Sequence, residues 1–584
     1  MKNSVTSCTA PPYSFGKVSI QWALLPLALL SWNACAQVVP PTPGAGQLLK
    51  QVEPVITPSS PTVNPPALRI EPAAVTTLIA ETSTPIAVTT IELSGNKSFD
   101  TATLKALVAD AEGRTQTLTE LNTLARRITD FYIAQGQPLA SAFLPEQTMD
   151  DGVLRIVVVE AKYGQIRVEN RSRLSTAQIE SFVESLKSGD VVLLGPLDRS
   201  LLLLRDLAGV TVTANARPGA EPGTTDLVLT AVDAPRVTGT FSLDDQGSKS
   251  SGRARGIASV DLRNFLGHGE TFSGLALTSG AGMAYARAAV QAPVTGVGTT
   301  VGVGVAQLQY KLGDVFASLD ANGTATVYDG FVQQSLIRST RAVLNADLRF
   351  EYKILKDRVD SVSTRTYRTL TSMTPGLSGE LRDEWGGGGR TNFSISYTVG
   401  GVEFGDATAE SKDQDVAGAN IRGSYARLNV ELARQQSLGA WPALANTTLV
   451  ARVRAQGANK NIDSSEQISI AGPQGVRGYD ANALSGAQGY VATLELRQML
   501  ANNKYGVFQT QAFADSGQVT IYRNPLLNST LPNRALMQSV GLGASWATQL
   551  GWNANLSVAR PISSAPEIAA HRSTRAWLTV GGTF

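Results

Sequence analysis

The sequence predicts a transmembrane β-barrel of about 16 antiparallel strands, preceded by two small α+β domains and by a short helix on a proline-rich linker. Three observations predict this fold. The C-terminal 350 residues, from 235 to 584, alternate apolar and polar side chains with a period of two. The residues from 85 to 234 contain the same order of strands and helices twice, and the N-terminus has the features of a secretory signal.

The first 36 residues predict a signal peptide. Lys2 and Lys17 lie in a polar region that precedes the apolar stretch Trp22–Trp32, and the small residues Ala34–Ala36 suit a cleavage site. Cleavage there would leave Gln37 as the first residue. A membrane anchor is the alternative interpretation, and the shortness of the apolar stretch argues against it.

Composition argues against enzyme chemistry. The two cysteines, Cys8 and Cys35, both lie in the predicted signal, so the mature chain would have neither a thiol nor a disulfide. The two histidines, His268 and His571, are far apart in sequence, which leaves little material for a zinc centre or a serine–histidine hydrolase. We therefore expect no catalytic residue, metal or cofactor. A formal net charge of +2 gives no reason to expect nucleic acid as a partner.

Residues 37–84 predict a helix on a tether. The stretch Ala45–Glu53 has helical character. A proline-rich composition then excludes regular structure until about Leu68 and favours an extended, semi-rigid linker. The prolines concerned are Pro54, Pro58, Pro61, Pro65 and Pro66.

Residues 85–161 predict the first α+β domain, in the order β-α-α-β-β. A strand at 86–96 precedes helices at 98–111 and 117–136, and two strands close the domain at 138–144 and 153–161. Both helices have start signals. Thr117 and Glu120 fit a capping box, and Asp100 or Thr101 suits the N-cap of the first helix.

Residues 162–234 repeat this order. A strand at 164–170 is followed by helices at 175–190 and 195–209 and by strands at 210–219 and 224–234. Ser175 suits the N-cap of the first of these helices. Two copies at a period of about 75 residues constitute an internal repeat.

Residues 235–584 predict the barrel. In the segment Arg341–Ile354 every second residue is apolar, and most residues between them are charged or polar. A soluble β-sandwich with one wet face would show the same alternation. A membrane barrel is favoured because the apolar faces are long enough to span about ten tilted residues, and because charges along a whole strand suit a water-filled lumen. Phe584, which ends the last alternating strand, is the expected barrel-assembly signal.

One glycine-rich stretch, Gly472–Asp480 (GPQGVRGYD), places a single arginine beside a tyrosine. A second stretch, 507–517, alternates so that Phe513 and Asp515 share its polar face with two glutamines. A carboxylate on the polar face of a transmembrane strand points into the lumen.

These features resemble the outer-membrane transporters of two-partner secretion, the TpsB family of haemolysin secretion and activation proteins. Both α+β copies resemble POTRA domains, the periplasmic modules of such transporters. In the first copy Ala161 departs from the usual glycine, and in the second Ala208 replaces a common proline. The helix before the linker resembles the plug helix of the family, and the barrel resembles its 16-stranded pore. The residues of the first copy that match are Gly136, Pro145, Gln147, Gly152 and Glu160.

The resemblance also implies a functional pair of motifs. The stretch VRGYD resembles the V-R-G-[FY] motif of a long loop that folds back into the barrel, and FADSG resembles its F-x-D-x-G partner on a strand. Arg477 would then meet Asp515 in the lumen, where a guanidinium can hold a carboxylate through two bonds. The expected site residues are Arg477, Gly478, Tyr479, Phe513, Asp515 and Gly517.

By this resemblance the chain exports one large exoprotein, adhesin-like or haemolysin-like and β-helical, across the outer membrane, with its POTRA domains in the periplasm. Its other partners would be outer-membrane lipid and the machinery that inserts its own barrel. The sequence has no nucleotide-binding P-loop, so the mechanism would be physical rather than covalent. An insertion factor for other barrels, from the same superfamily, is the alternative. A passive porin would not need the repeat, and a secreted enzyme would need a catalytic cluster.

Overall fold

The computed structural model describes residues 42–52, 68–70, 85–148, 150–280, 282–527, 532–563 and 573–584. The predicted signal peptide and most of the predicted linker lie outside these residues. Among the helices of the described part, none is long and apolar enough to cross a membrane.

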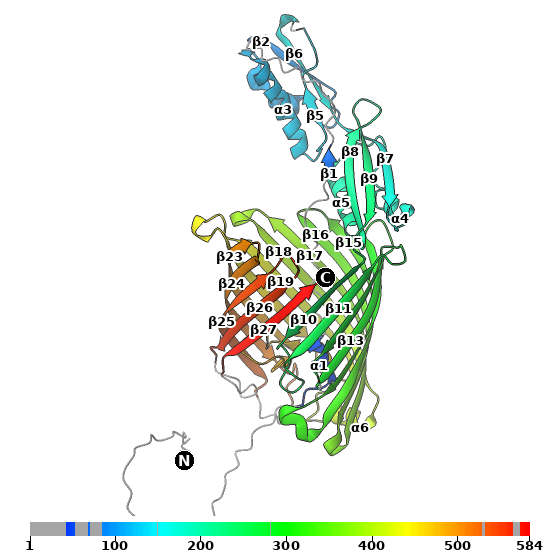
Figure 1. Ribbon diagram of the computed structural model, residues 1–584, viewed down its shortest axis with the longest axis vertical. Coiled ribbons are helices and arrows are strands. Elements are labelled where there is room, and N and C mark those ends of the chain that lie inside the picture. Colours follow the sequence, from blue (N-terminus) through cyan, green and yellow to red (C-terminus); the bar gives the residue numbers. More distant parts are fainter. Residues whose placement is uncertain are drawn as a thin grey trace, which may run out of the picture. The chain divides into compact units, whose positions relative to one another are not determined.

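In the described part of the chain sixteen antiparallel strands form one closed barrel, which confirms the predicted fold class (Figure 1). Each strand pairs with the next one along the chain, and the last strand pairs with the first. The loop between β20 and β23 holds two further short strands, β21 (Ile468–Ser469) and β22 (Ser485–Gly486). The barrel strands are β10 (Val237–Asp244), β11 (Arg255–Arg263), β12 (Thr271–Thr278), β13 (Met283–Pro293), β14 (Thr299–Lys311), β15 (Ala321–Arg338), β16 (Ala342–Val359), β17 (Thr364–Asp383), β18 (Gly389–Phe404), β19 (Gly423–Ser437), β20 (Thr447–Ala458), β23 (Gln488–Asn503), β24 (Gly506–Thr520), β25 (Arg534–Ala547), β26 (Asn553–Pro561) and β27 (Arg575–Thr583).

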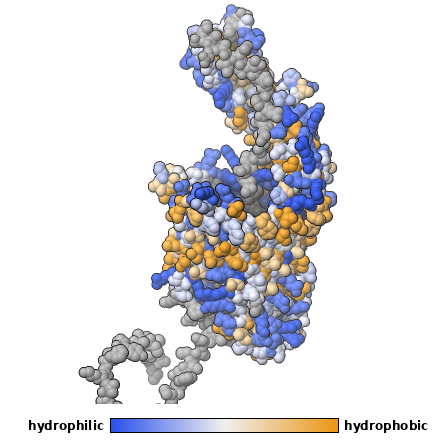
Figure 2. All heavy atoms as spheres, viewed as in Figure 1, coloured by the Kyte–Doolittle hydropathy of each residue, from blue (hydrophilic) through white to orange (hydrophobic). Residues whose placement is uncertain are grey.

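The outer surface of the barrel carries the apolar side chains. Figure 2 shows a band of hydrophobic residues across the visible face of the barrel, with hydrophilic residues above and below it. Because strand side chains alternate between two faces, the same strands present their other residues to the lumen. In β16, for example, Phe350 is 51% exposed, whereas Lys353 on the opposite face is 2% exposed. This arrangement fits a lipid-facing exterior and a polar interior.

The first α+β copy contains a three-stranded and a two-stranded sheet. Its elements are β2 (Ile86–Val88), β3 (Thr90–Ser94), α2 (Thr101–Ala106), β4 (Arg114–Gln116), α3 (Leu118–Ala134), β5 (Ser141–Phe143) and β6 (Val153–Val159). The predicted single strand at 86–96 is divided in two, because β2 pairs with β4 while β3 pairs in parallel with β6. The sequence analysis missed β4.

The second copy contains β7 (Lys162–Arg171), α4 (Thr176–Ser181), α5 (Leu194–Arg205), β8 (Val210–Pro218) and β9 (Thr224–Asp233). Its sheet has the order β1-β8-β9-β7. The outer strand β1 (Leu68–Ile70) comes from the predicted linker and pairs in parallel with β8. The linker therefore supplies a strand that the sequence analysis did not expect.

Helix starts follow the predicted signals with one correction. Thr117 and Glu120 form both bonds of a capping box at α3, and the Ser175 side chain accepts a bond from Gln178 at α4. Asp100 occupies the N-cap of α2, but its side chain makes no capping hydrogen bond. Both α2 and α4 have only six residues and are shorter than predicted. The turns that follow α2 and α4 also bury apolar residues. The helical spacing of apolar residues in the sequence therefore extends past the end of each helix, and it predicted helices that were too long.

Candidate functional site

Strand β24 presents two of the predicted site residues to the lumen. Phe513 is 5% exposed and Asp515 is 3% exposed, whereas Phe508 on the outer face is 37% exposed. The neighbouring strand β23 pairs with β24 so that Thr493 lies opposite Asp515 and Glu495 lies opposite Phe513. Alternation along both strands therefore gathers two carboxylates on one lumen-facing patch.

The loop of residues 459–487, between β20 and β23, brings the arginine to this patch. Its short strands β21 and β22 pair as an antiparallel ladder, and the GPQGVRGYD stretch lies between them. Gly472 has a φ of +101° and lies so close to Ala481 that a Cβ would be 2.7 Å from the Ala481 Cα atom. A glycine is needed there because other residues disfavour this backbone conformation.

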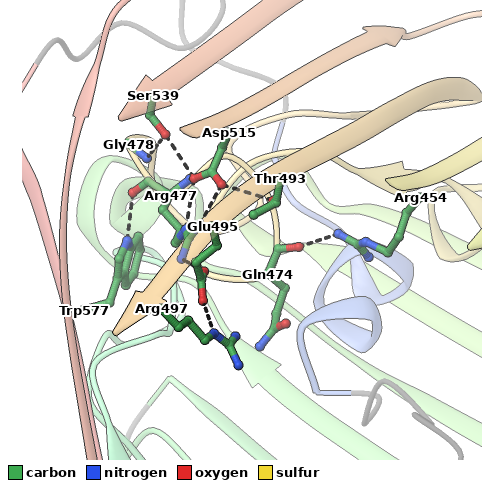
Figure 3. A network of polar contacts seen from close by, with 10 residues as sticks. All are labelled: Arg454, Gln474, Arg477, Gly478, Thr493, Glu495, Arg497, Asp515, Ser539 and Trp577. Carbon is green, nitrogen blue, oxygen red and sulfur yellow. Dashed lines mark hydrogen bonds and ion pairs between the residues drawn. The ribbon is translucent and has the colours of Figure 1, made fainter. Parts of the chain in front are cut away.

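Arg477 binds both carboxylates of the patch (Figure 3). Its Nη2 donates to Asp515 Oδ1 at 2.8 Å and its Nε donates to Asp515 Oδ2 at 3.0 Å. Its Nη1 donates to Glu495 Oε2 at 3.0 Å. The guanidinium carbon also lies 3.3 Å from the centroid of the Phe513 ring, so the ring stacks on the cation. Four residues from a loop and two strands thus make one contact network.

Other groups complete the charges and hydrogen bonds of the network. Thr493 Oγ1 and Ser539 Oγ donate to Asp515 at 3.1 and 3.2 Å, and Arg477 donates its own backbone N–H to the same carboxylate. Arg497 pairs with Glu495, so that two guanidiniums balance two carboxylates. Buried charges need such pairing, because an isolated charge out of water is strongly unfavourable.

Two glycines allow the loop to approach the barrel wall. A Cβ on Gly478 would lie 2.7 Å from the Ser539 Cβ atom, and a Cβ on Gly517 would lie 3.0 Å from a methyl carbon of Val476. Tyr479 is 2% exposed and packs in an apolar cluster that includes Val519 of β24, and its hydroxyl lies 2.9 Å from Ser563 Oγ.

The first part of the same loop is held at a different sector of the wall. Glu466 is fully buried and lies 2.8 Å from both Lys353 Nζ of β16 and Arg427 Nε of β19. Asp463 pairs with Arg368 of β17. The loop therefore crosses from strands β16, β17 and β19 to strands β23 and β24.

Helix α1 (Ala45–Val52) packs against this part of the loop and against the lumen wall. Leu48 and Leu49 are fully buried among apolar side chains of the barrel interior. The Ala45 N–H donates to Asp357 Oδ1 at 2.6 Å at the helix N-terminus, where a carboxylate is favourable. A Cβ on Gly46 would lie 2.6 Å from the Ser465 nitrogen, so helix and loop are in close contact.

The structure brings together the six motif residues that the sequence analysis singled out, namely Arg477, Gly478, Tyr479, Phe513, Asp515 and Gly517. Phe584 lies elsewhere and exchanges backbone hydrogen bonds with Gly239 of β10. Sequence reasoning missed Glu495, Ser539 and Trp577, whose Nε1 donates to the Arg477 carbonyl at 2.8 Å. Alternation along β23, where Thr493, Glu495 and Arg497 share one face, was the signal that could have found Glu495.

Residues 223–544 match the family model of the haemolysin secretion/activation proteins ShlB/FhaC/HecB. The chain belongs to this family. Residues 86–161 match the model of the ShlB-type POTRA domain.

Similar proteins agree with this membership. The heme/hemopexin transporter protein HuxB of Haemophilus influenzae is 27% identical over 84% of this chain and 85% of its own length. The outer membrane transporter CdiB of Escherichia coli is 25% identical over 74% of this chain and 72% of its own length. These relatives are named as transporters.

Solved structures share the fold. CdiB from Escherichia coli matches with a TM-score of 0.64 at 21% identity, covering 88% of this chain and 93% of that one. BamA from Haemophilus ducreyi, lacking its first three POTRA domains, matches with a TM-score of 0.53 at 14% identity, covering 86% of this chain and all of that one. The second likeness is one of fold, and the family match favours export over insertion of other barrels.

The chain is thus an outer-membrane transporter of two-partner secretion, which exports a partner exoprotein through its β-barrel. Its POTRA domains lie in the periplasm. Strand β10 follows the second POTRA copy directly, so the start of β10 marks the periplasmic end of the barrel. Because successive strands run in opposite directions, the loop of residues 459–487 enters the lumen from the extracellular end.

Proposed function

We propose that the chain captures one large unfolded exoprotein in the periplasm and passes it through the lumen after helix α1 and the loop of residues 459–487 have moved aside. The main support for this proposal is that helix α1 and the loop occupy the lumen through which the exoprotein would pass. Helix α1 buries Leu48 and Leu49 against the inner wall, and the loop is held to the wall by ion pairs such as Arg477–Asp515. All these contacts are noncovalent, so both obstacles can leave. Folding of the exoprotein outside then makes export directional.

Capture would use the free edge of a POTRA sheet. An extended segment can add to an exposed strand edge through backbone hydrogen bonds. In the second copy β1 already covers β8, and β7 is the other outer strand. A groove of about 320 Å³ lies beside β7, and its apolar side chains include Ile166, Val168 and Val183. Glu180 and Glu184 also line the groove and favour a segment that carries lysine or arginine next to apolar residues.

The exoprotein would be adhesin-like or haemolysin-like and β-helical, and the transporter would itself be inserted by the barrel-assembly machinery. A β-helical exoprotein suits this route because its stacked strands can form one after another as the chain emerges. The proposed mechanism needs no cofactor and no covalent step.

The test is secretion of the exoprotein that this chain exports, measured at matched amounts of folded barrel. A variant that lacks residues 85–234 should secrete none. The double variant Glu180→Lys and Glu184→Lys should secrete less, because the acidic rim would then repel the basic segment. Glu221→Lys, in the exposed turn between β8 and β9, is the matched control and should secrete normally. Normal secretion without residues 85–234 would contradict capture by the POTRA domains.

A cargo that serves haem or hemopexin transport is a second candidate, favoured by the similarity to HuxB over 84% of the chain. The secreted exoprotein should then bind haem or hemopexin in a pull-down from culture medium. An exoprotein that binds neither would rule out this cargo while leaving the export function intact.

A further inference from the structure

The barrel is closed by its first and last strands, β10 and β27, and this seam is short. Its register covers five residue pairs, from Thr240–Thr583 to Asp244–Thr579, whereas β16 is paired with β17 over its full length. Gly239 and Phe584 add two backbone hydrogen bonds at the periplasmic end. Strand edges that lack a partner are weak points in a sheet, so a short seam needs other support.

The extracellular end of β27 extends beyond the paired part of the seam. The strand begins at Arg575, and its register with β10 begins only at Thr579. Beyond the seam register, the Leu578 carbonyl accepts a hydrogen bond from the Asp245 backbone N–H. The Leu578 backbone N–H in turn donates to the Asp245 side chain. On its other side this part of β27 remains paired with β26. The inner face of the extension carries Arg575 and Trp577.

The loop of residues 459–487 contacts this extension from the lumen. Trp577 Nε1 donates to the Arg477 carbonyl at 2.8 Å, and the Trp577 side chain is buried. Arg575 Nη2 donates to Asp480 Oδ2 at 2.7 Å, and the Arg575 side chain is 11% exposed. Loop residues thus hold β27 where β10 does not reach it.

Asp480 also binds the other side of the seam. Its second oxygen, Oδ1, accepts from Arg253 Nη2 at 3.2 Å. Arg253 lies in the connection between β10 and β11, two residues before β11 begins. Each carboxylate oxygen therefore has its own guanidinium, one from each side of the seam, and the two bonds exist together.

We infer that Asp480 is a seam brace, which holds the first and last strands of the barrel together while the loop is in its resting position. The brace is distinct from the bond between Arg477 and Asp515, which anchors the loop to β24. The two are coupled, because Asp480 follows Arg477 by three residues on the same loop. Withdrawal of the loop from the lumen removes the brace and leaves the seam with its short register and the few hydrogen bonds that Gly239 and Asp245 make across it.

Disulfide formation across the seam tests this inference. Leu243 and Val580 are register partners in β10 and β27 and are 67% and 39% exposed. Leu243→Cys with Val580→Cys supplies a cysteine pair whose oxidation requires adjacent strands. The whole sequence has only Cys8 and Cys35, both in the predicted signal. The rate of cross-linking by a copper oxidant is measured on gels, in outer membranes that contain the full-length protein.

With the seam braced, the cysteine pair should cross-link fast. Asp480→Asn, which keeps the size of the side chain but removes its charge, should slow cross-linking about threefold, the effect of one partly exposed ion pair. Arg253→Gln should act in the same direction because it removes one arm of the brace. Asp515→Ala should also slow cross-linking, although β24 is three strands away from β27, because it releases the loop.

Lys311→Gln is the matched control. Lys311 pairs with Asp320 at the same end of the barrel, 2.7 Å away. It belongs to β14 and not to either strand of the seam, so its loss should leave the rate unchanged. Heat-modifiable migration on gels shows that each variant is folded. If folded Asp480→Asn cross-links as fast as the protein that carries the cysteine pair alone, Asp480 does not brace the seam. A parental rate in folded Asp515→Ala would overturn its coupling to the loop anchor.

Discussion

Arg477 and Asp515 face each other through two parallel hydrogen bonds, from Nη2 to Oδ1 at 2.8 Å and from Nε to Oδ2 at 3.0 Å. The Asp515 side chain is fully buried and that of Arg477 is 11% exposed. A guanidinium bound through two of its N–H groups is fixed in orientation as well as in distance. The pair therefore sets both the position and the rotation of the loop tip in the lumen.

Arg477→Ala should assemble into a barrel but secrete poorly. Removing one member of a buried ion pair typically costs about 3–5 kcal/mol, and the water of the lumen should reduce that cost. Asp515→Ala should behave similarly, and the double variant should be less than additive because the pair acts as a unit. A secretion assay at matched barrel amounts measures all three. Normal secretion by both single variants would mean that the pair has no role in export.

Reversal of the pair, Arg477→Asp with Asp515→Arg, should restore little secretion. Asp515 also accepts bonds from Thr493 and Ser539, and Arg477 also binds Glu495. An arginine at 515 would lose those donors, and an aspartate at 477 would face Glu495 with the same charge. Recovery to parental secretion would show that a simple opposite-charge contact is enough.

Gly46→Leu should expel helix α1 from the lumen. A Cβ at this position would lie 2.6 Å from the Ser465 backbone nitrogen, which cannot move aside as a flexible side chain can. Single-channel conductance in planar bilayers should rise, as it should when residues 45–53 are deleted, while secretion continues. Gly457→Ala is the control, since a Cβ there meets no atom within 4 Å. Unchanged conductance in both helix variants would leave α1 without a plugging role.

Deletion of Phe584 should lower the amount of assembled barrel. The backbone of Phe584 exchanges hydrogen bonds with that of Gly239. The Phe584 ring lies so close to Gly239 that a Cβ on this glycine would be 2.2 Å from a ring carbon. Gly239→Val should therefore displace the ring and act in the same direction. Gly256→Ala is the control, because the nearest atom to its Cβ would be 3.6 Å away. The folded fraction on unheated gels measures the effect, and an undiminished fraction in the deletion would exclude an assembly role.

Glu160→Gln should destabilise the first POTRA domain by about 1–3 kcal/mol. Glu160 is 9% exposed and accepts bonds from the Lys97 and Ser98 N–H groups, the Ser98 hydroxyl and the Tyr132 hydroxyl. Burial raises the pKa of Glu160, but these bonds outweigh it and hold the pKa below its usual value of 4.5. The stabilisation is therefore complete above pH 4.5 and is lost as the pH falls through the lowered pKa.

Denaturant unfolding of residues 85–234 at neutral and acidic pH measures this difference. Glu92→Gln is the control, because Glu92 pairs with Arg155 on the surface, where such a pair contributes little. The gap in free energy of unfolding between the parent and Glu160→Gln should narrow at acidic pH. A gap that stays constant with pH would mean that the charge of Glu160 is not what stabilises the domain.

Local patterns predicted the elements that depend on neighbours in sequence. The capping box of Thr117 and Glu120 spans four residues, and its hydrogen bonds form within them. The inward face of Asp515 follows from the two-residue period of its strand. The pairing of β1 with β8 was not predictable in this way, because it joins Leu68 to Ala214 across a long stretch of chain.

The sequence by itself determined the barrel class, the repeated POTRA order and the two motifs, because periodicity and residue type are local properties of the chain. Only the tertiary structure decided which groups complete the pair of Arg477 and Asp515, since Glu495 reaches Arg477 and Ser539 reaches Asp515 through strand register and loop closure. Only the tertiary structure showed the contacts of Asp480 as well, because in the sequence this residue is simply the last of the stretch VRGYD. Its contacts with Arg253 and Arg575 exist because closing the barrel brings its first and last strands together.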